Sequence, residues 1–257
     1  MSPAWSSLTD EVRAALAAKG LDIVAPLRLR WYNDVAPGTA LIKPMTGVAG
    51  DDALVLLVGN SRALWPAFCA AHDSDAVIGE SEHPVDTYVT WEISAAVSSC
   101  SNPPRVFHSH DTTPGNLVAI QRMAQVAGVA HLDEKCHLSI HPNYGPWIAL
   151  RAAVVFDDLT GPSENERPET PLNPLATDTD ARERVDVAFT KALEGYDDPS
   201  TTLERWQRWV AVRDAVAPVK HAERYYDDQV LYHYNCQTAG SERTRIRDGL
   251  RAYRKKV

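Results

Sequence analysis

The sequence predicts an α+β fold in which a core of strands and helices is followed by a helical C-terminal part. Two continuous apolar runs, Ala53–Gly59 and Trp147–Asp157, have the length and composition of central strands. A proline-rich and acidic stretch, Leu159–Thr179, then interrupts the apolar pattern, as an extended connecting loop would. After it the pattern is helical, so we expect helices to form the last third of the chain.

The core elements can be placed in order from caps and periodicity. A first helix is expected over Leu8–Lys19, with Thr9 as its N-cap and Gly20 just beyond its end. A strand is expected to follow over Ile23–Trp31. The remaining core elements are helices over Arg62–His72, Val85–Val97 and Gly115–Ala130, and a short strand over Arg105–Ser109.

The boundaries that follow are a core over 1–157, a connector over 158–179 and a helical part over 180–257. We expect these to pack as one structural domain. The helices expected in the last part are Asp180–Leu193, Leu203–Val216, Ala222–Tyr234 and Ser241–Lys255.

Composition and charge narrow the class of protein. The 257 residues are 44% hydrophobic and carry a net charge of −8, which argues against a general nucleic-acid binder. No apolar run is long enough to span a bilayer, and the N-terminus lacks the pattern of a signal peptide. The four cysteines are scattered, as reduced thiols of a cytoplasmic protein would be. We therefore expect a cytoplasmic monomer or homodimer without nucleic-acid or membrane partners.

Histidines gather in two places that could hold a metal. His108 and His110 lie two apart on an expected strand and so share one face, which suits chelation. A second patch contains His131, Asp133, Glu134, His137 and His141. If the chain folds so that the two places meet, a transition metal such as iron could be held by His108, His110 and one of Asp133, His137 and His141. The alternative is that neither place binds a metal. His108 and His110 would then only end a strand, and the second patch would be a solvated loop.

Three arginines are the other candidates. Arg151 interrupts an apolar strand just after two histidines and a turn, Arg213 lies in an apolar helix, and Arg243 is near the C-terminus. An unpaired buried guanidinium is costly, so Arg151 needs a partner. That partner is either an acid such as Asp214 in a structural ion pair or a carboxylate or phosphate on a ligand.

No dinucleotide-binding glycine motif, P-loop or zinc-protease motif is present in the sequence. An ordered series of short motifs nevertheless resembles the intracellular cobalamin-processing proteins of the CblC type, the cyanocobalamin reductases (cyanide-eliminating). The resemblance extends from about the first helix to the C-terminal helices, and the order of the motifs carries it. The series is Trp31-Tyr32-Asn33, Leu54–Val58, Leu64–Phe68, Pro84-Val85-Asp86, Val126-Ala127-Gly128, Ile140-His141-Pro142, Gly145, Trp147, Arg151, Val212-Arg213-Asp214-Ala215-Val216 and Glu223-Arg224-Tyr225.

The resemblance implies a nitroreductase-like α+β sandwich, a sheet flanked by helices, with a helical C-terminal cap. It implies an oxidoreductase that binds base-off cobalamin in a large cavity and removes its upper axial ligand. Cyanide would leave by reduction with a diffusible reduced flavin (FMN or FAD), and alkyl groups by transfer to a thiol such as glutathione. The implied cobalamin contacts are Phe107, His108, Val118, Ala119, Ile120, Gln121, Leu132, Asp133, Glu134, Ser139 and Leu150. The implied thiol-binding residues are Arg151, Arg213 and Arg243.

Departures from the family pattern lie in this implied pocket. Leu132-Asp133-Glu134 stands where animal members have two tyrosines and a glutamine, Ser139 replaces a cysteine, and Gln125 replaces a histidine. Two alternatives therefore remain open. One is a metal-dependent oxidoreductase on the same fold, with the histidine and aspartate ligands named above. The other is a cobalamin chaperone that performs no chemistry.

Overall fold

The computed structural model describes residues 3–46, 48–195 and 202–235, with the backbone alone for 202–205 and 235. Its centre is an antiparallel sheet in the order β1-β2-β6-β3. These strands are β1 (Ile23–Arg28), β2 (Ala53–Asn60), β6 (Ala149–Thr160) and β3 (Arg105–His108). The two runs predicted as central strands are β2 and β6, and each has a neighbour on both sides.

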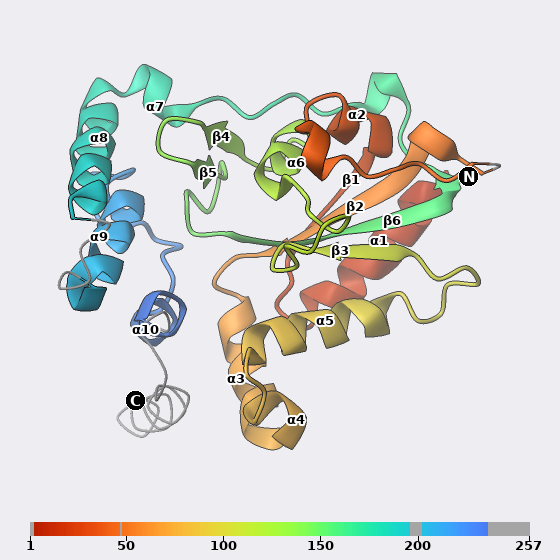
Figure 1. Cartoon of the computed structure of the whole chain (residues 1–257), viewed down its shortest axis with the longest axis horizontal. Coiled ribbons are helices and arrows are strands. Elements are labelled where there is room, and N and C mark those ends of the chain that lie inside the picture. The colour runs from red at the N-terminus through yellow and green to blue at the C-terminus, as the bar shows by residue number, and fades with distance from the viewer. Residues whose placement is uncertain (1–2, 47, 196–201, 236–257) are drawn as a thin grey trace.

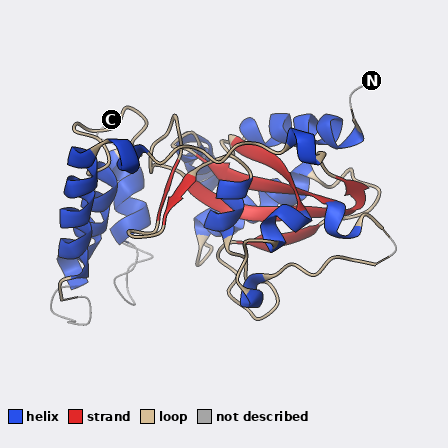
Figure 2. Cartoon of the chain, turned by 90° about the horizontal axis from the view of Figure 1, so that it is seen from above, coloured by secondary structure: helices blue, strands red, loops and turns tan. Residues whose placement is uncertain are grey.

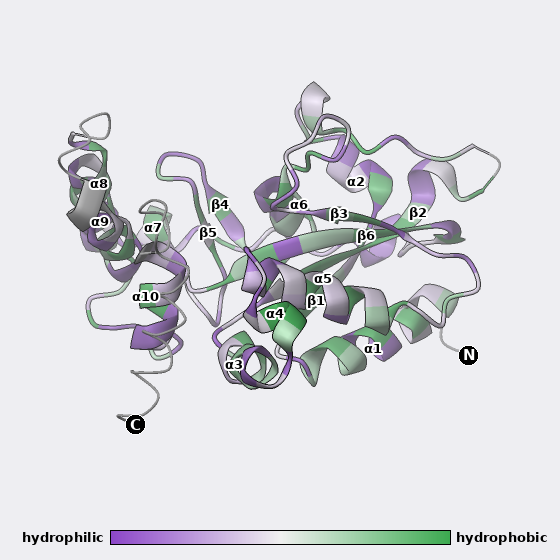
Figure 3. Cartoon of the chain, turned by 60° about the horizontal axis from the view of Figure 1, so that its bottom comes forward, coloured by the Kyte–Doolittle hydropathy of each residue, from purple (hydrophilic) through white to green (hydrophobic). Residues whose placement is uncertain are grey.

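Helices cover both faces of this sheet (Figure 1, Figure 2). One face is covered by α1 (Ala4–Ala17), α3 (Leu64–Ser74), α4 (Ala76–Gly79) and α5 (Pro84–Ala96). The other face is covered by α2 (Leu29–Asn33) and α6 (Ile120–Val126). Side chains alternate between the faces along β2, so Leu54 and Leu56 pack under the first group and Val55 and Leu57 under the second. Figure 3 shows the central strands mainly in the hydrophobic colour.

Three expected core elements differ in detail. The first helix begins at Ala4, so Thr9 lies inside it and its hydroxyl donates to the carbonyl of Trp5 at 2.6 Å. Thr9 is therefore not the N-cap, whereas Gly20 does follow the helix end, with a φ of +77°. The strand expected to reach Trp31 stops at Arg28, because the chain turns into α2.

The helix expected over Gly115–Ala130 is only seven residues long and begins at Ile120. A polar loop takes the place of its first turns. The carboxylate of Asp111 accepts hydrogen bonds from the backbone N–H and hydroxyl of Thr113 and from the Asn116 amide. Such local bonds compete with helical ones, and Gly115 adopts a φ of +95° that a helix does not use.

The histidine-rich patch forms a two-stranded sheet of β4 (His131–Asp133) and β5 (Leu138–Ile140).

The proline-rich stretch that follows β6 is not an unpacked linker. Glu164 accepts a hydrogen bond from the buried indole of Trp31 at 2.7 Å, and Leu175 is buried. The stretch is the connecting loop that the sequence predicts, but it packs on the core through polar and apolar contacts of its own. Short helical turns in the chain are η1 (Gly38–Ala40), η2 (Gly50–Asp52), η3 (Glu164–Glu166) and α7 (Pro174–Thr177).

The C-terminal helices form a group beside the core (Figure 1, Figure 2). They are α8 (Thr179–Leu193), α9 (Thr202–Asp214) and α10 (Asp227–Asn235). The first two agree with the sequence prediction, α10 begins five residues later than expected, and the helix expected over Ser241–Lys255 lies outside the described residues. Leu138 and Ile140 of the hairpin pack with Val185 and Val212 of these helices. In the described ranges, none of the helices combines the length and apolar character that crossing a membrane requires.

Candidate functional site

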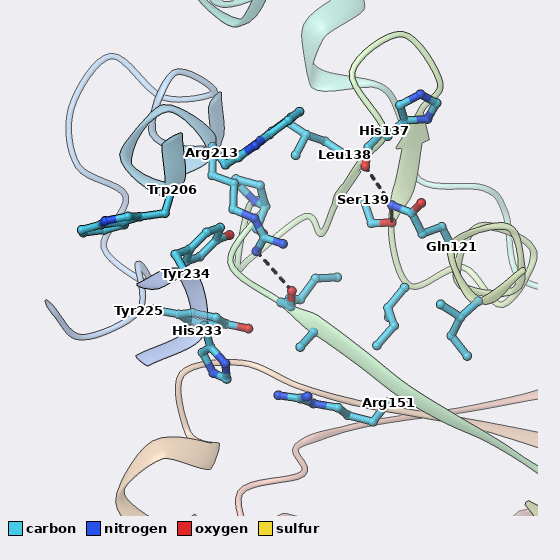
Figure 4. A pocket seen from close by; sticks show the side chains of 16 residues that line it. Gln121, His137, Leu138, Ser139, Arg151, Trp206, Arg213, Tyr225, His233 and Tyr234 are labelled. Carbon is cyan, nitrogen blue, oxygen red and sulfur yellow. Dashed lines mark hydrogen bonds between the residues drawn. The ribbon is translucent and has the colours of Figure 1, made fainter. Parts of the chain in front are cut away.

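A cavity of about 690 Å³ lies between the core and the C-terminal helices (Figure 4). Its walls come from α6, β5, the start of β6, α9, and α10 with the loop before it. The lining residues are Ile120, Gln121, His137, Leu138, Ser139, Pro146, Ile148, Ala149, Leu150, Arg151, Trp206, Trp209, Arg213, Tyr225, His233 and Tyr234. Two arginines and no carboxylate are among them. The wall is therefore positively charged and suits an anionic ligand.

Arg151 reaches this cavity because β6 is irregular at that point. Val58 of β2 pairs with Ala152 and Gly59 pairs with Leu150, which leaves Arg151 without a pairing residue on β2. The strands approach closely here: a Cβ on Gly59 would lie 2.7 Å from the carbonyl oxygen of Ala149. A bulge of this kind redirects the side chain of the extra residue. The cation in an apolar strand is thus explained by a local break in the strand pairing.

The Arg151 guanidinium is only partly paired. Its Nε donates to Asn60 Oδ1 at 2.7 Å, and its Nη1 lies 3.9 Å from Asp86 Oδ1 on α5. Its Nη2 is buried without a hydrogen-bond partner among the described residues. Burial lowers the pKa of Arg151, partly offset by nearby Tyr225 and Asp86, but a guanidinium stays protonated at neutral pH.

The alternative of a structural ion pair holds in part for Arg151, but the acid is Asp86 at 3.9 Å and not Asp214. Asp214 lies next to Arg224 instead, with its Oδ1 2.8 Å from Arg224 Nε. Asp214 therefore helps to hold the loop before α10 against the end of α9.

Arg213 is held by uncharged groups. Its Nη1 donates to the carbonyl of Pro146 at 2.7 Å, and its Cζ lies 5.7 Å from the ring centroids of both Trp147 and Tyr234. No carboxylate forms an ion pair with it in the part of the chain that the structure describes. Arg213 therefore offers a positive charge to whatever fills the cavity. Arg243 lies outside the described residues.

Four of the residues that the resemblance assigned to cobalamin line the same cavity: Ile120, Gln121, Ser139 and Leu150. Gln121 joins α6 to the hairpin, because its amide donates to the carbonyl of His137 at 2.9 Å and to the Ser139 hydroxyl at 3.2 Å. Figure 4 shows these two bonds at one edge of the pocket. Ile120 and Leu150 add apolar surface beside them.

The other assigned residues lie elsewhere. Phe107 and Val118 are buried in the core under α6, and Ala119 packs against the same core. Leu132 is buried. Glu134 is exposed and pairs with Arg122 at 3.0 Å. Neither these five residues nor His108 and Asp133 are among the residues that line the cavity.

The proposed metal ligands do not meet. The rings of His108 and His110 stack with centroids 5.0 Å apart, which confirms that they share a face, and His110 lies 3.6 Å from Asp86. His141 instead stacks on Tyr144 and accepts hydrogen bonds from the backbone of its own turn. Asp133 is engaged by Cys136 and Arg182. Among the described residues, no three histidine, cysteine, aspartate or glutamate side chains form a group suited to a metal ion.

Several lining residues were missed from the sequence. Trp206 and Trp209, which were not named, lie three residues apart on α9, and Arg213, which was named, follows four residues later, so the three share one face of the helix. That spacing was a usable signal. Tyr225 and His233 had no such spacing signal in the sequence. They reach the cavity because of the path of the loop before α10 and the placement of α10.

Comparisons with known proteins agree with the observed fold. No protein-family model matches the chain. Proteins named cyanocobalamin reductase / alkylcobalamin dealkylase are similar to it. The human protein is 23% identical over 248 residues, covering 90% of this chain and 79% of its own. The bovine protein is 25% identical over 252 residues, covering 90% and 79%. The Danio rerio protein is 24% identical over 237 residues, covering 86% and 85%.

A crystal structure of a C. elegans B12-trafficking protein, CblC, matches with a TM-score of 0.66 and 18% identity, and the match covers 95% of this chain and 96% of that one. This chain resembles the CblC proteins. The resemblance inferred from the ordered motifs is thus confirmed over most of the chain, and the mixed helix and sheet architecture agrees with the CblC structure.

Proposed function

We propose that this chain is an enzyme that binds cobalamin and removes its upper axial ligand, by reductive decyanation, by thiol-dependent dealkylation, or by both. The similarity to the CblC proteins and to the named reductases and dealkylases supports the proposal. The observation that carries it is the composition of one cavity. Residues assigned to cobalamin, such as Gln121 and Leu150, and residues assigned to the thiol, Arg151 and Arg213, line that cavity together.

The walls of the cavity suit the two proposed ligands differently. Ile120, Ile148 and Leu150 offer an apolar surface for part of the corrin ring, and its volume is in the range of about 300–1,000 Å³ typical of small-molecule sites. Cobalamin is larger than a drug-sized ligand, so we expect the cavity to hold the reactive centre and not the whole molecule. Binding without the nucleotide base on cobalt makes the metal easier to reduce, so the binding mode itself assists the chemistry.

The two arginines suit a co-substrate with a carboxylate. A charge-assisted hydrogen bond in a partly buried site is stronger than one in water and orients the rest of the ligand. In dealkylation, the thiolate sulfur forms a bond to the alkyl carbon while the cobalt–carbon bond breaks, and its electron pair stays on cobalt. In decyanation a diffusible reduced flavin supplies electrons and cyanide departs. Holding the thiol near the corrin is the task we assign to Arg151 and Arg213.

Finer features belong to the same proposal. We propose that the fold is a nitroreductase-like sandwich with a helical cap, divided into a core over 1–157, a connector over 158–179 and a helical part over 180–257. Cys100 and Cys136 are free thiols, which fits a cytoplasmic location. A monomer or a homodimer is consistent with the cavity, since one chain supplies all of its described walls.

The visible spectrum of the purified protein with added cobalamin tests the proposal. We expect a base-off spectrum, followed by loss of the upper ligand when a thiol or a reduced flavin is added. Ala149→Phe should weaken binding because the larger side chain enters the cavity, whereas Ala70→Phe on the exposed side of α3 should not. Binding without turnover would indicate a chaperone. No spectral change, together with about one metal ion per chain in the untreated protein, would favour the metal-dependent alternative.

A further inference from the structure

Two uncharged side chains face the cavity next to the arginines. The phenol oxygen of Tyr225 and the Nε2 of His233 are both buried, and neither has a hydrogen-bond partner among the described residues. Arg151 Nη2 is likewise buried and has no hydrogen-bond partner among the described residues. Figure 4 shows Tyr225 and His233 on the wall that faces Arg151. Buried polar atoms normally have partners, so three unpartnered ones on one cavity indicate a place for a polar ligand group.

These side chains are held in place by packing. The Tyr225 ring lies 5.5 Å from Trp147 and 5.6 Å from His233, measured between ring centroids. Trp147 is fully buried and also lies under Arg213. Tyr225 itself is 4% exposed. The hydrogen-bonding atoms are thus positioned before a ligand arrives, which reduces the entropy cost of binding.

Both side chains are uncharged at neutral pH. Burial, together with the charges of Arg151 and Arg213, lowers the pKa of His233 to about 3. Burial raises the pKa of Tyr225 to about 12 against the opposing effect of the same arginines. The phenol therefore keeps its proton, and the imidazole is neutral and can donate from one nitrogen. This part of the cavity wall therefore offers hydrogen bonds from the neutral side chains of Tyr225 and His233 beside the positive charges of the two arginines.

We propose that Tyr225 and His233, together with Arg151, receive the carboxylate of the co-substrate and make the protein prefer a carboxylate-bearing thiol to a neutral one. The inference rests on the proposed function and extends it from the arginines to two neutral specificity residues. A carboxylate has enough lone pairs to accept from all three groups at once. A neutral thiol leaves those buried groups unpaired, and sites built to hydrogen-bond a ligand group discriminate strongly against ligands that lack it.

A matched pair of thiols tests this inference on the full-length protein. 3-Mercaptopropionate and 3-mercaptopropanol have similar sulfhydryl groups and differ at the other end of the molecule. We expect the protein loaded with methylcobalamin to dealkylate with a KM for the acid at least tenfold below that for the alcohol. Tyr225→Phe and His233→Asn should each raise the KM for the acid about tenfold and bring it closer to the KM for the alcohol. Tyr226→Phe, at a neighbouring tyrosine that is 43% exposed, is the matched control.

Calorimetric binding of the two thiols without cobalamin separates this inference from the proposed function. Tighter binding of the acid that Tyr225→Phe weakens supports the carboxylate site even if cobalamin does not bind. Equal affinity for acid and alcohol, or equal loss of both in the variants, overturns it even if cobalamin shows a base-off spectrum. Loss of acid binding on adding inorganic phosphate at low concentration also overturns the inference. The wall formed by Tyr225, His233 and Arg151 would then prefer a phosphate group to a carboxylate.

Discussion

Arg182 of α8 donates from Nη1 to Asp133 Oδ2 across 2.6 Å, and this pair joins the β4–β5 hairpin to the C-terminal helices. The other oxygen of Asp133 accepts from the backbone N–H and the thiol of Cys136. Burial would raise the pKa of Asp133, but these bonds and the Arg182 charge outweigh it and hold the pKa below its ordinary value. Asp133 thus stabilises the hairpin, whose next strand carries Ser139 to the cavity wall.

Replacing Asp133 with asparagine should lower the free energy of unfolding by about 2 kcal/mol, because Arg182 loses its buried anionic partner but keeps Asp186. Urea denaturation followed by circular dichroism measures this change. Asp10→Asn removes the exposed partner of Arg13 and should cost less than about 0.5 kcal/mol. Similar losses in the two variants would contradict the structural role of the Asp133 pair.

The same carboxylate makes stability depend on pH. The pKa of Asp133 is lower in the folded state, so the unfolded chain binds its proton more readily and ionisation favours folding. The contribution of Asp133 to the free energy of unfolding is fully present above its pKa in the unfolded chain, about 3.9. It is lost as the pH falls through its lower pKa in the folded protein. The difference in urea midpoint between the natural protein and Asp133→Asn should therefore be constant from pH 8 to pH 5. It should shrink below about pH 4, and a constant difference down to pH 2.5 would exclude this linkage.

Arg151→Met should change catalysis more than folding. The substitution removes a buried charge with a single close partner and leaves Asn60 Oδ1 unpaired, so we expect a loss of about 1–2 kcal/mol in unfolding free energy. The KM for a carboxylate-bearing thiol should rise tenfold or more, with the base-off spectrum of bound cobalamin retained. Arg151→Lys keeps the charge without the planar guanidinium and should recover part of the lost affinity. Unchanged KM in both variants would remove Arg151 from the thiol site.

Cys136 should be unreactive in the folded protein. Burial, together with the neighbouring Asp133 carboxylate, raises the pKa of its thiol to about 11. A thiol with so little thiolate alkylates slowly, which also fits a reaction whose thiol comes from a co-substrate. Iodoacetamide at pH 8 followed by peptide mass spectrometry should show Cys136 unmodified in buffer and modified in urea. Rapid modification in buffer would mean that the hairpin opens from α8.

The elements that sequence predicts well here are those whose signals are local. The apolar runs of β2 and β6 have the length of strands and are apolar at successive positions, which predicts strands that are buried on both faces of a sheet. Gly20 ends α1 because its φ of +77° is one that other residues rarely adopt. The ordered motifs of the resemblance reach further, since they led to a cavity wall with Gln121 and Leu150 on it. The helix expected from Gly115 fails because side-chain hydrogen bonds at Asp111 compete with it.

By itself, the sequence determined that Arg151 needs a polar partner, because a guanidinium in an apolar strand is costly wherever the strand lies. It could not determine which partner, since that depends on a one-residue break in the pairing of β2 with β6. The tertiary structure decided that Arg151 faces Tyr225 and His233, which are more than seventy positions away, as the printed numbering shows. It also decided that Asp133 pairs with Arg182 and not with a ligand. Contacts between distant segments follow from how whole elements pack, which no local pattern of residue types records.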